Sequence, residues 1–135
     1  MTAPAINSLD ALRQHVREFA QARAWERYHT PKNLVMALIV EAAELLEPFQ
    51  WMTAEQSRQL SAEQHESVRQ EVADMLIYLT RLADVLEIDL LEAAADKLAI
   101  NARKYPVDSA HGNALKYSSL PGYLANPSDQ DRPDD

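Results

Sequence analysis

Two pairs of acidic residues lie inside apolar stretches of this chain, and their spacing suits metal chemistry. Glu41 and Glu44 follow the apolar run LVMALIV. Glu71 and Asp74 lie in the apolar-rich segment VRQEVADMLIYLTRLADVL. Residues three apart on a helix project from the same side, so each pair presents its two carboxylates together. We refer to these four residues as the four acids.

Carboxylates in apolar surroundings are costly to keep charged, and four of them between two packed helices would repel one another. A divalent cation offsets both costs, and oxygen ligands suit Mg²⁺, with Mn²⁺ as the alternative. The chain has no cysteine, so only oxygen and histidine ligands are available. The competing interpretation is that the four acids are solvated charges at helix edges. That interpretation fits a single E-x-x-E motif better than two matching pairs.

The apolar residues recur at helical intervals and the chain has only two glycines for tight turns, so we predict an all-α protein. The second predicted helix is apolar on most sides, and we expect it to be buried. The long helices are predicted over residues 8–27, 31–47, 62–87 and 89–105, with a short helical turn over 53–59. Their capping residues are Ser8, Thr30, Ser61, Asp89 and, for the short turn, Thr53.

Length and charge narrow the class of protein. The 135 residues are expected to form one domain over 1–117, followed by a mobile acidic tail over 118–135 that is polar and interrupted by proline. The net charge of −8 shows no basic surface for a nucleic-acid polymer. The N-terminus lacks a secretory-signal pattern and the longest apolar run is too short to cross a bilayer, so we expect a cytoplasmic protein without a membrane partner.

The spacing E-x-x-E followed by E-x-x-D resembles the signature of the MazG-like, all-α nucleoside triphosphate pyrophosphohydrolases. The stretches WERYHTPKNLVMALIVEAAELLEPFQW, EVADMLIYLTRLAD and INARKYP are similar to the dCTP pyrophosphatase branch of that family. The resemblance extends from about Phe19 to Tyr117. It implies a four-helix MazG-like bundle that assembles with a second subunit, as a dimer or a tetramer.

The resemblance also implies a reaction. A nucleoside triphosphate would be hydrolysed at the α–β phosphoanhydride bond, giving the monophosphate and pyrophosphate. The four acids would bind Mg²⁺, which neutralises the triphosphate and acidifies a bound water. Of the two glutamates on the second helix, Glu41 and Glu44, one would orient or deprotonate the attacking water, and we assign that role to Glu44.

Further residues match substrate-binding positions of the family. An aromatic platform can hold a base by stacking, and the candidates are Trp25, Trp51 and Tyr78. Cationic and polar donors can hold phosphate oxygens, and the candidates are Lys97, Asn101, Arg103, Lys104 and Tyr105, with the pair Lys116-Tyr117 after them. Core packing could instead account for the aromatic residues, and helix-dipole pairing for the basic ones. The branch has a histidine where this chain has Val16 beside His15, which leaves the preferred base open.

Two other functions were considered. A carboxylate-bridged di-iron bundle needs two E-x-x-H motifs. Only Glu26-x-x-His29 qualifies, and Thr30-Pro31 ends its segment, so we interpret His29 as a structural or loop residue. A non-enzymatic helical dimerisation module would use the apolar helices but would leave the four acids unexplained.

Overall fold

The computed structural model describes residues 4–123, and every regular element in that part of the chain is helical, which confirms the predicted all-α class. The chain forms two compact units, Met1–Leu90 and Leu91–Asp135, which are described separately. None of the helices in residues 4–123 is both long and apolar enough to span a membrane. The elements are α1 (Leu9–Gln21), α2 (Pro31–Leu46), α3 (Ala54–Ser57), α4 (Ala62–Val85), α5 (Leu90–Lys104), α6 (Val107–Ala110) and the 3₁₀ helix η1 (Tyr117–Ser119).

Capping residues set the starts of the helices in the first unit. The Ser8 hydroxyl accepts a hydrogen bond from the Ala11 N–H at 3.1 Å, and the Thr30 hydroxyl accepts one from the Asn33 N–H at 3.3 Å. Thr53 and Ser61 each form a complete capping box. These bonds satisfy backbone N–H groups that have no partner inside the helix. The predicted starts of α1, α2, α3 and α4 are therefore confirmed.

The first helix ends at Gln21, so the prediction that it continues to Arg27 is wrong. The Trp25 N–H donates to the Ala20 carbonyl, and the Ala24 N–H donates to the Gln21 carbonyl, both at 3.0 Å. This pair of bonds is the Schellman motif, and Ala24 adopts the left-handed conformation that it requires (φ 51°). The apolar spacing continues past Gln21 because Trp25 folds back onto the last turn of α1.

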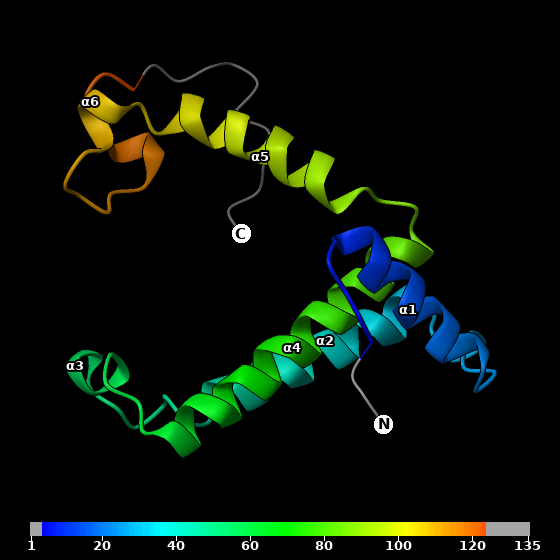
Figure 1. Ribbon diagram of the computed structural model, residues 1–135. Coiled ribbons are helices and arrows are strands. Elements are labelled where there is room, and N and C mark those ends of the chain that lie inside the picture. The colour runs from blue at the N-terminus through cyan, green and yellow to red at the C-terminus, as the bar shows by residue number, and fades with distance from the viewer. Residues whose placement is uncertain (1–3, 124–135) are drawn as a thin grey trace. The chain divides into compact units, whose positions relative to one another are not determined.

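In the first unit, α2 packs along α4 and α1 packs on the later part of α4 (Figure 1). The chain passes from α2 to α4 through α3, at the end of the pair that lies away from α1 (Figure 1). Each of the three long helices of this unit supplies a buried apolar side chain. These residues are Ala20 of α1, Leu34 of α2 and Ala83 of α4. The small core lies where these helices meet.

One side of α2 is uncovered in the single chain. Val35, Met36, Ile39 and Val40 are 46–65% exposed. The prediction that this helix is buried is therefore wrong for the isolated chain, because α4 covers only one side of it. An apolar face of this kind would lose contact with water only against another protein surface.

The second unit contains α5, α6 and η1. Leu120 is buried, and the ring of Tyr117 makes edge-to-face contacts with the rings of Tyr105 and Tyr123. These contacts include the first residues of the segment that we expect to be a mobile tail, whereas residues 124–135 lie outside the described residues. The domain boundary after Tyr117 stays a prediction.

Helix α4 also ends in a Schellman motif, and Glu87 occupies its left-handed position (φ 56°). The Ile88 N–H donates to the Ala83 carbonyl at 2.8 Å, and the Glu87 N–H donates to the Asp84 carbonyl at 3.3 Å. We expect Glu87→Gly to stabilise the fold by about 1 kcal/mol, because glycine avoids the steric cost of this conformation. The melting temperature should rise by roughly 3–5 °C in a calorimetric scan. Glu87→Ala keeps the steric cost, so an equal rise in that variant would contradict the explanation.

Candidate functional site

Helix packing brings three of the four acids together. One carboxylate oxygen from each of Glu41, Glu44 and Glu71 lies within 4.8 Å of the others. The two helices that carry them, α2 and α4, lie side by side, and so residues distant in sequence meet. Asp74 is not part of this group. Three carboxylate oxygens at this spacing could surround one divalent cation, and the metal-binding role of the four acids stays a prediction.

Burial and mutual repulsion act on the same carboxyl groups. Burial first, and then the charges of Glu44, Asp74 and Glu71, raise the pKa of Glu41. Burial, followed by the charges of Glu44 and Asp74, raises the pKa of Glu71. One oxygen of Glu71 is buried without a hydrogen-bond partner among residues 4–123. These carboxylates are costly to keep charged without a cation, and Asp74 adds to that cost through its charge.

The three predicted base-platform residues lie at different places in the first unit. Trp25 precedes α2 and Trp51 follows it, and a helix of 16 residues is about 24 Å long. Trp51 is 88% exposed, so the core-packing interpretation is wrong for this residue in the single chain. Tyr78 is half-buried on α4. A single chain therefore does not place Trp25 and Trp51 against the same base.

Trp25 has a defined set of neighbours. Its ring makes edge-to-face contacts with Phe19, at 5.7 Å between ring centroids, and with His29, at 6.1 Å. The contact with Phe19 joins the residue after the Schellman turn to the last turn of α1, as is common in this motif. The Nδ1 atom of His29 accepts a hydrogen bond from Arg81 of α4 at 3.1 Å. The sequence analysis missed this contact, because residue type alone does not show that Arg81 is buried.

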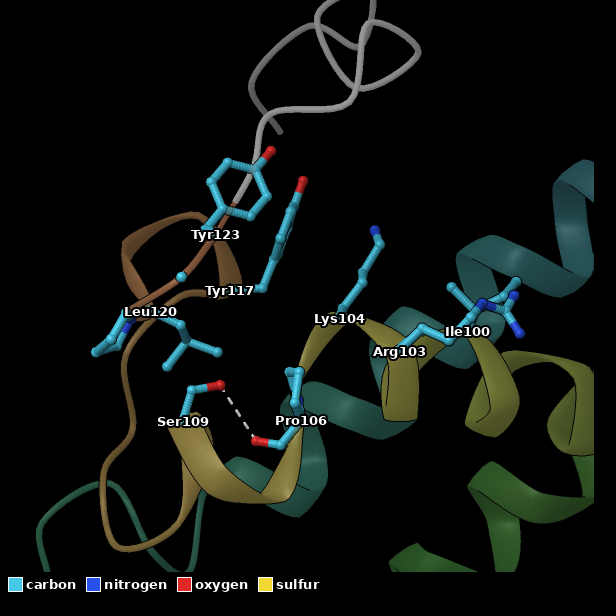
Figure 2. Close-up of a pocket in the computed structure, with 10 residues that line it drawn as sticks. Ile100, Arg103, Lys104, Pro106, Ser109, Tyr117, Leu120 and Tyr123 are labelled. Atoms are coloured by element: carbon cyan, nitrogen blue, oxygen red, sulfur yellow. Dashed lines mark hydrogen bonds between the residues drawn. The ribbon is translucent and has the colours of Figure 1, made fainter.

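The predicted phosphate ligands all belong to the second unit. Arg103 and Lys104 line a pocket of about 350 Å³ with Tyr117, Leu120 and other residues of the unit (Figure 2). The ammonium of Lys104 lies 4.5 Å from the centroid of the Tyr117 ring.

Three other candidates do not line this pocket. Lys97 and Asn101 lie on preceding turns of α5, and Tyr105 contacts the ring of Tyr117. The structure thus brings Arg103 and Lys104 together in one pocket. That these residues and the four acids bind the same triphosphate stays a prediction.

We expect Glu71→Gln to stabilise the metal-free protein at neutral pH. The pKa of Glu71 is raised in the folded state, so the unfolded chain binds fewer protons and folding stability falls as the pH rises through that pKa. The neutral amide of glutamine does not ionise, so Glu71→Gln avoids this loss of folding stability at high pH. The melting temperature in EDTA should exceed that of the parent at pH 8, and the difference should shrink as the pH is lowered and Glu71 takes up its proton.

Asp96→Asn on the exposed surface of α5 makes the same change in net charge and serves as the control for Glu71→Gln. An equal gain in the control would show that only the overall charge of −8 had been relieved.

A family model and the sequences of known proteins place this chain in the same family. Residues 36–120 match the model of the MazG-like family. The chain is 40% identical to bovine (Bos taurus) dCTP pyrophosphatase 1 over 116 residues, which cover 84% of this chain and 69% of that protein. It is also 40% identical to the human (Homo sapiens) dCTP pyrophosphatase 1, covering 84% and 68%.

A crystal structure of a pyrophosphatase from Archaeoglobus fulgidus DSM 4304 is similar in fold as well as in sequence. The TM-score is 0.70 at 40% identity, and the match covers 78% of this chain and 99% of that one. The family match over residues 36–120 includes all four acids. The chain therefore belongs to the MazG-like family, in its dCTP pyrophosphatase branch, a group of nucleotide pyrophosphatases.

Proposed function

We propose that this protein hydrolyses a (deoxy)nucleoside triphosphate to the monophosphate and pyrophosphate, with Mg²⁺ held by the four acids. The reaction class is supported by membership of the MazG-like family and by relatives named dCTP pyrophosphatase 1. The single observation that supports a metal-assisted reaction is the convergence of Glu41, Glu44 and Glu71 within 4.8 Å. Substrates related to dCTP are the first candidates because of these relatives.

The exposure of Glu41, Glu44 and Glu71 indicates which of them would bind the cation and which would accept a proton. When bound, Mg²⁺ supplies charge neutralisation for the triphosphate and lowers the pKa of a water molecule. Glu41 and Glu71 are half-buried and would hold the cation from the side of the core. Glu44 is exposed, so its carboxylate can reach the attacking water and accept its proton.

We further propose that two copies of the chain complete the four-helix bundle and the base site. The uncovered apolar face of α2 needs a partner surface, and a second α2 running in the opposite direction would provide one. The same arrangement would bring Trp25 of one copy near Trp51 of the partner subunit, which the length of α2 prevents within one chain. Tyr78 would complete the base site, and phosphate oxygens would be bound by Lys97, Asn101, Arg103, Lys104 and Tyr105.

The reaction is tested with a panel of ribo- and deoxyribonucleoside triphosphates in the presence of Mg²⁺. We expect pyrophosphate and the monophosphate as products, with turnover lost in EDTA and restored by Mg²⁺ or Mn²⁺. Release of orthophosphate would contradict cleavage at the α–β bond. The relative rates across the panel also identify the preferred base and sugar.

Single alanine substitutions of the four acids should lower kcat at saturating nucleotide by at least about a hundredfold, because metal-held charge dominates phosphoryl transfer. Circular dichroism should show that each variant folds, since each substitution removes a repelling charge. Asp96→Asn again provides a control that changes the charge outside the cluster. Full activity in any two of the four variants would rule out the four-acid site.

Trp51→Ala should raise KM by roughly five- to a hundredfold while changing kcat much less. Stacking acts on the base, far from the reacting phosphorus, so it should be similar in the ground state and the transition state. Trp51→Phe retains a stacking surface and should preserve most of the affinity. An unchanged KM in Trp51→Ala would remove this residue from the base site.

A further inference from the structure

An ion cluster around the buried carboxylate of Asp84 joins α1 to α4 and is separate from the four acids. The carboxylate of Asp84, whose side chain is only 5% exposed, accepts hydrogen bonds from three arginines. The donors are Arg81 at 2.9 Å, Arg17 at 3.0 Å and Arg13 at 3.3 Å. The bond from Arg17 first, and that from Arg13 after it, lower the pKa of Asp84 in spite of its burial. The carboxylate is thus charged at neutral pH and orients the guanidinium groups around it.

Arg81 connects this cluster to the segment before α2. The residue is 6% exposed, and its guanidinium donates from Nη1 to Asp84 and from Nε to Nδ1 of His29. A planar guanidinium held at two edges has little freedom to rotate, so the bond also sets the orientation of the imidazole. Because Nδ1 accepts, the proton of the neutral imidazole lies on Nε2.

The charge state of His29 agrees with this role as an acceptor. Burial first, and then the positive charge of Arg81, lower its pKa, whereas Glu26 opposes the shift. Asp84 also faces Arg81 and offsets part of its charge. The imidazole is therefore neutral at pH 7, as the hydrogen bond from Arg81 requires.

His29 passes this orientation on to Trp25. The imidazole and the indole meet edge to face at an interplanar angle of 64°. The backbone N–H of His29 also donates to the backbone carbonyl of Trp25 at 3.1 Å. Phe19 contacts the same indole from α1. The indole is thus placed by one ring from α1 and by another that α4 orients, while 42% of Trp25 remains exposed.

We propose that Arg81, oriented by Asp84, is a positioning residue that acts through His29 to set the indole of Trp25 for base binding. This inference rests on the proposed function, in which Trp25 stacks on the base. A ring that is already oriented loses less side-chain entropy when the base binds than a mobile ring does. Along α4, Arg81 lies ten positions from Glu71 and seven from Asp74, about 15 Å and about 10 Å along the axis, so the cluster acts on the base and not on the reacting phosphorus.

The first test is Arg81→Lys. Lysine keeps the positive charge beside Asp84 but lacks the planar fork that also reaches His29. We expect KM to rise about five- to tenfold and kcat to stay within about twofold, because only part of the stacking interaction is lost. In the absence of nucleotide, the ¹H–¹⁵N indole cross-peak of Trp25 should shift, which reports the ring without any use of activity.

Arg13→Leu is the matched control. It removes another arginine from the same carboxylate, but Arg13 makes no hydrogen bond to His29 in the described part of the chain. We expect a similar loss of stability, with the indole cross-peak and KM unchanged. If Arg13→Leu changes the indole cross-peak and KM as much as Arg81→Lys does, these changes come from the lower stability of the ion cluster, and the proposal is overturned.

A second variant covers the case in which Arg81→Lys does not fold. His29→Phe keeps an aromatic ring beside Trp25 but removes the acceptor for Arg81. The indole cross-peak should shift and KM should rise, as in Arg81→Lys. Unchanged values for both would show that the Arg81–His29 bond does not orient Trp25, and the proposal would be overturned.

Trp25→Ala separates this proposal from the proposed function on which it rests. If this variant leaves KM unchanged, Trp25 is not a base platform and the positioning role is overturned with it. If it raises KM whereas Arg81→Lys changes neither KM nor the indole cross-peak, only the positioning role is wrong. A fall in kcat as large as the fall in kcat/KM in Arg81→Lys would also overturn it, because such a residue would act on the transition state.

Discussion

The site depends on the packing of α2 against α4. This contact brings Glu41 and Glu44 to Glu71, within 4.8 Å, and concentrates negative charge beside the core. The same contact must overcome the repulsion that it creates, since burial and neighbouring charges raise the pKa of Glu41 and of Glu71. A cation would turn this repulsion into attraction, so metal binding and helix packing would stabilise each other.

Helix length is a second constraint. A straight helix separates its ends by a fixed distance, and α2 therefore separates Trp25 from Trp51. It also exposes an apolar face that a single chain leaves in water. A second copy of the chain would account for both observations, because the exposed apolar face lies on the same helix that separates the two indoles. Assembly and base recognition would then share one surface.

Helix α4 carries two functional groups of residues at different positions along its length. Its middle carries Glu71 and Asp74, and its last turns carry Arg81 and Asp84. The first pair would act on phosphate through a cation, and the second orients His29 beside Trp25. Because a helix is stiff over this length, a base and a triphosphate could be held at a set separation without a large domain.

Local signals in the sequence were sufficient to predict the all-α class and the starts of the first-unit helices. They also singled out Glu41, Glu44 and Glu71, which the packing of α2 on α4 brings together. Caps such as Ser8 and Thr30 act within three residues, and helical periodicity decides which residues share a face. The end of α1, the exposure of α2 and the buried Arg81–Asp84 pair could not be predicted in the same way. The end of α1 is local, but it was missed because an alanine, Ala24, occupies the left-handed position of the turn that ends the helix. The exposure of α2 and the burial of Arg81 and Asp84 depend on which residues far apart in the chain come into contact. Charge and hydropathy read along a sequence do not contain that information, and only the tertiary structure decided it.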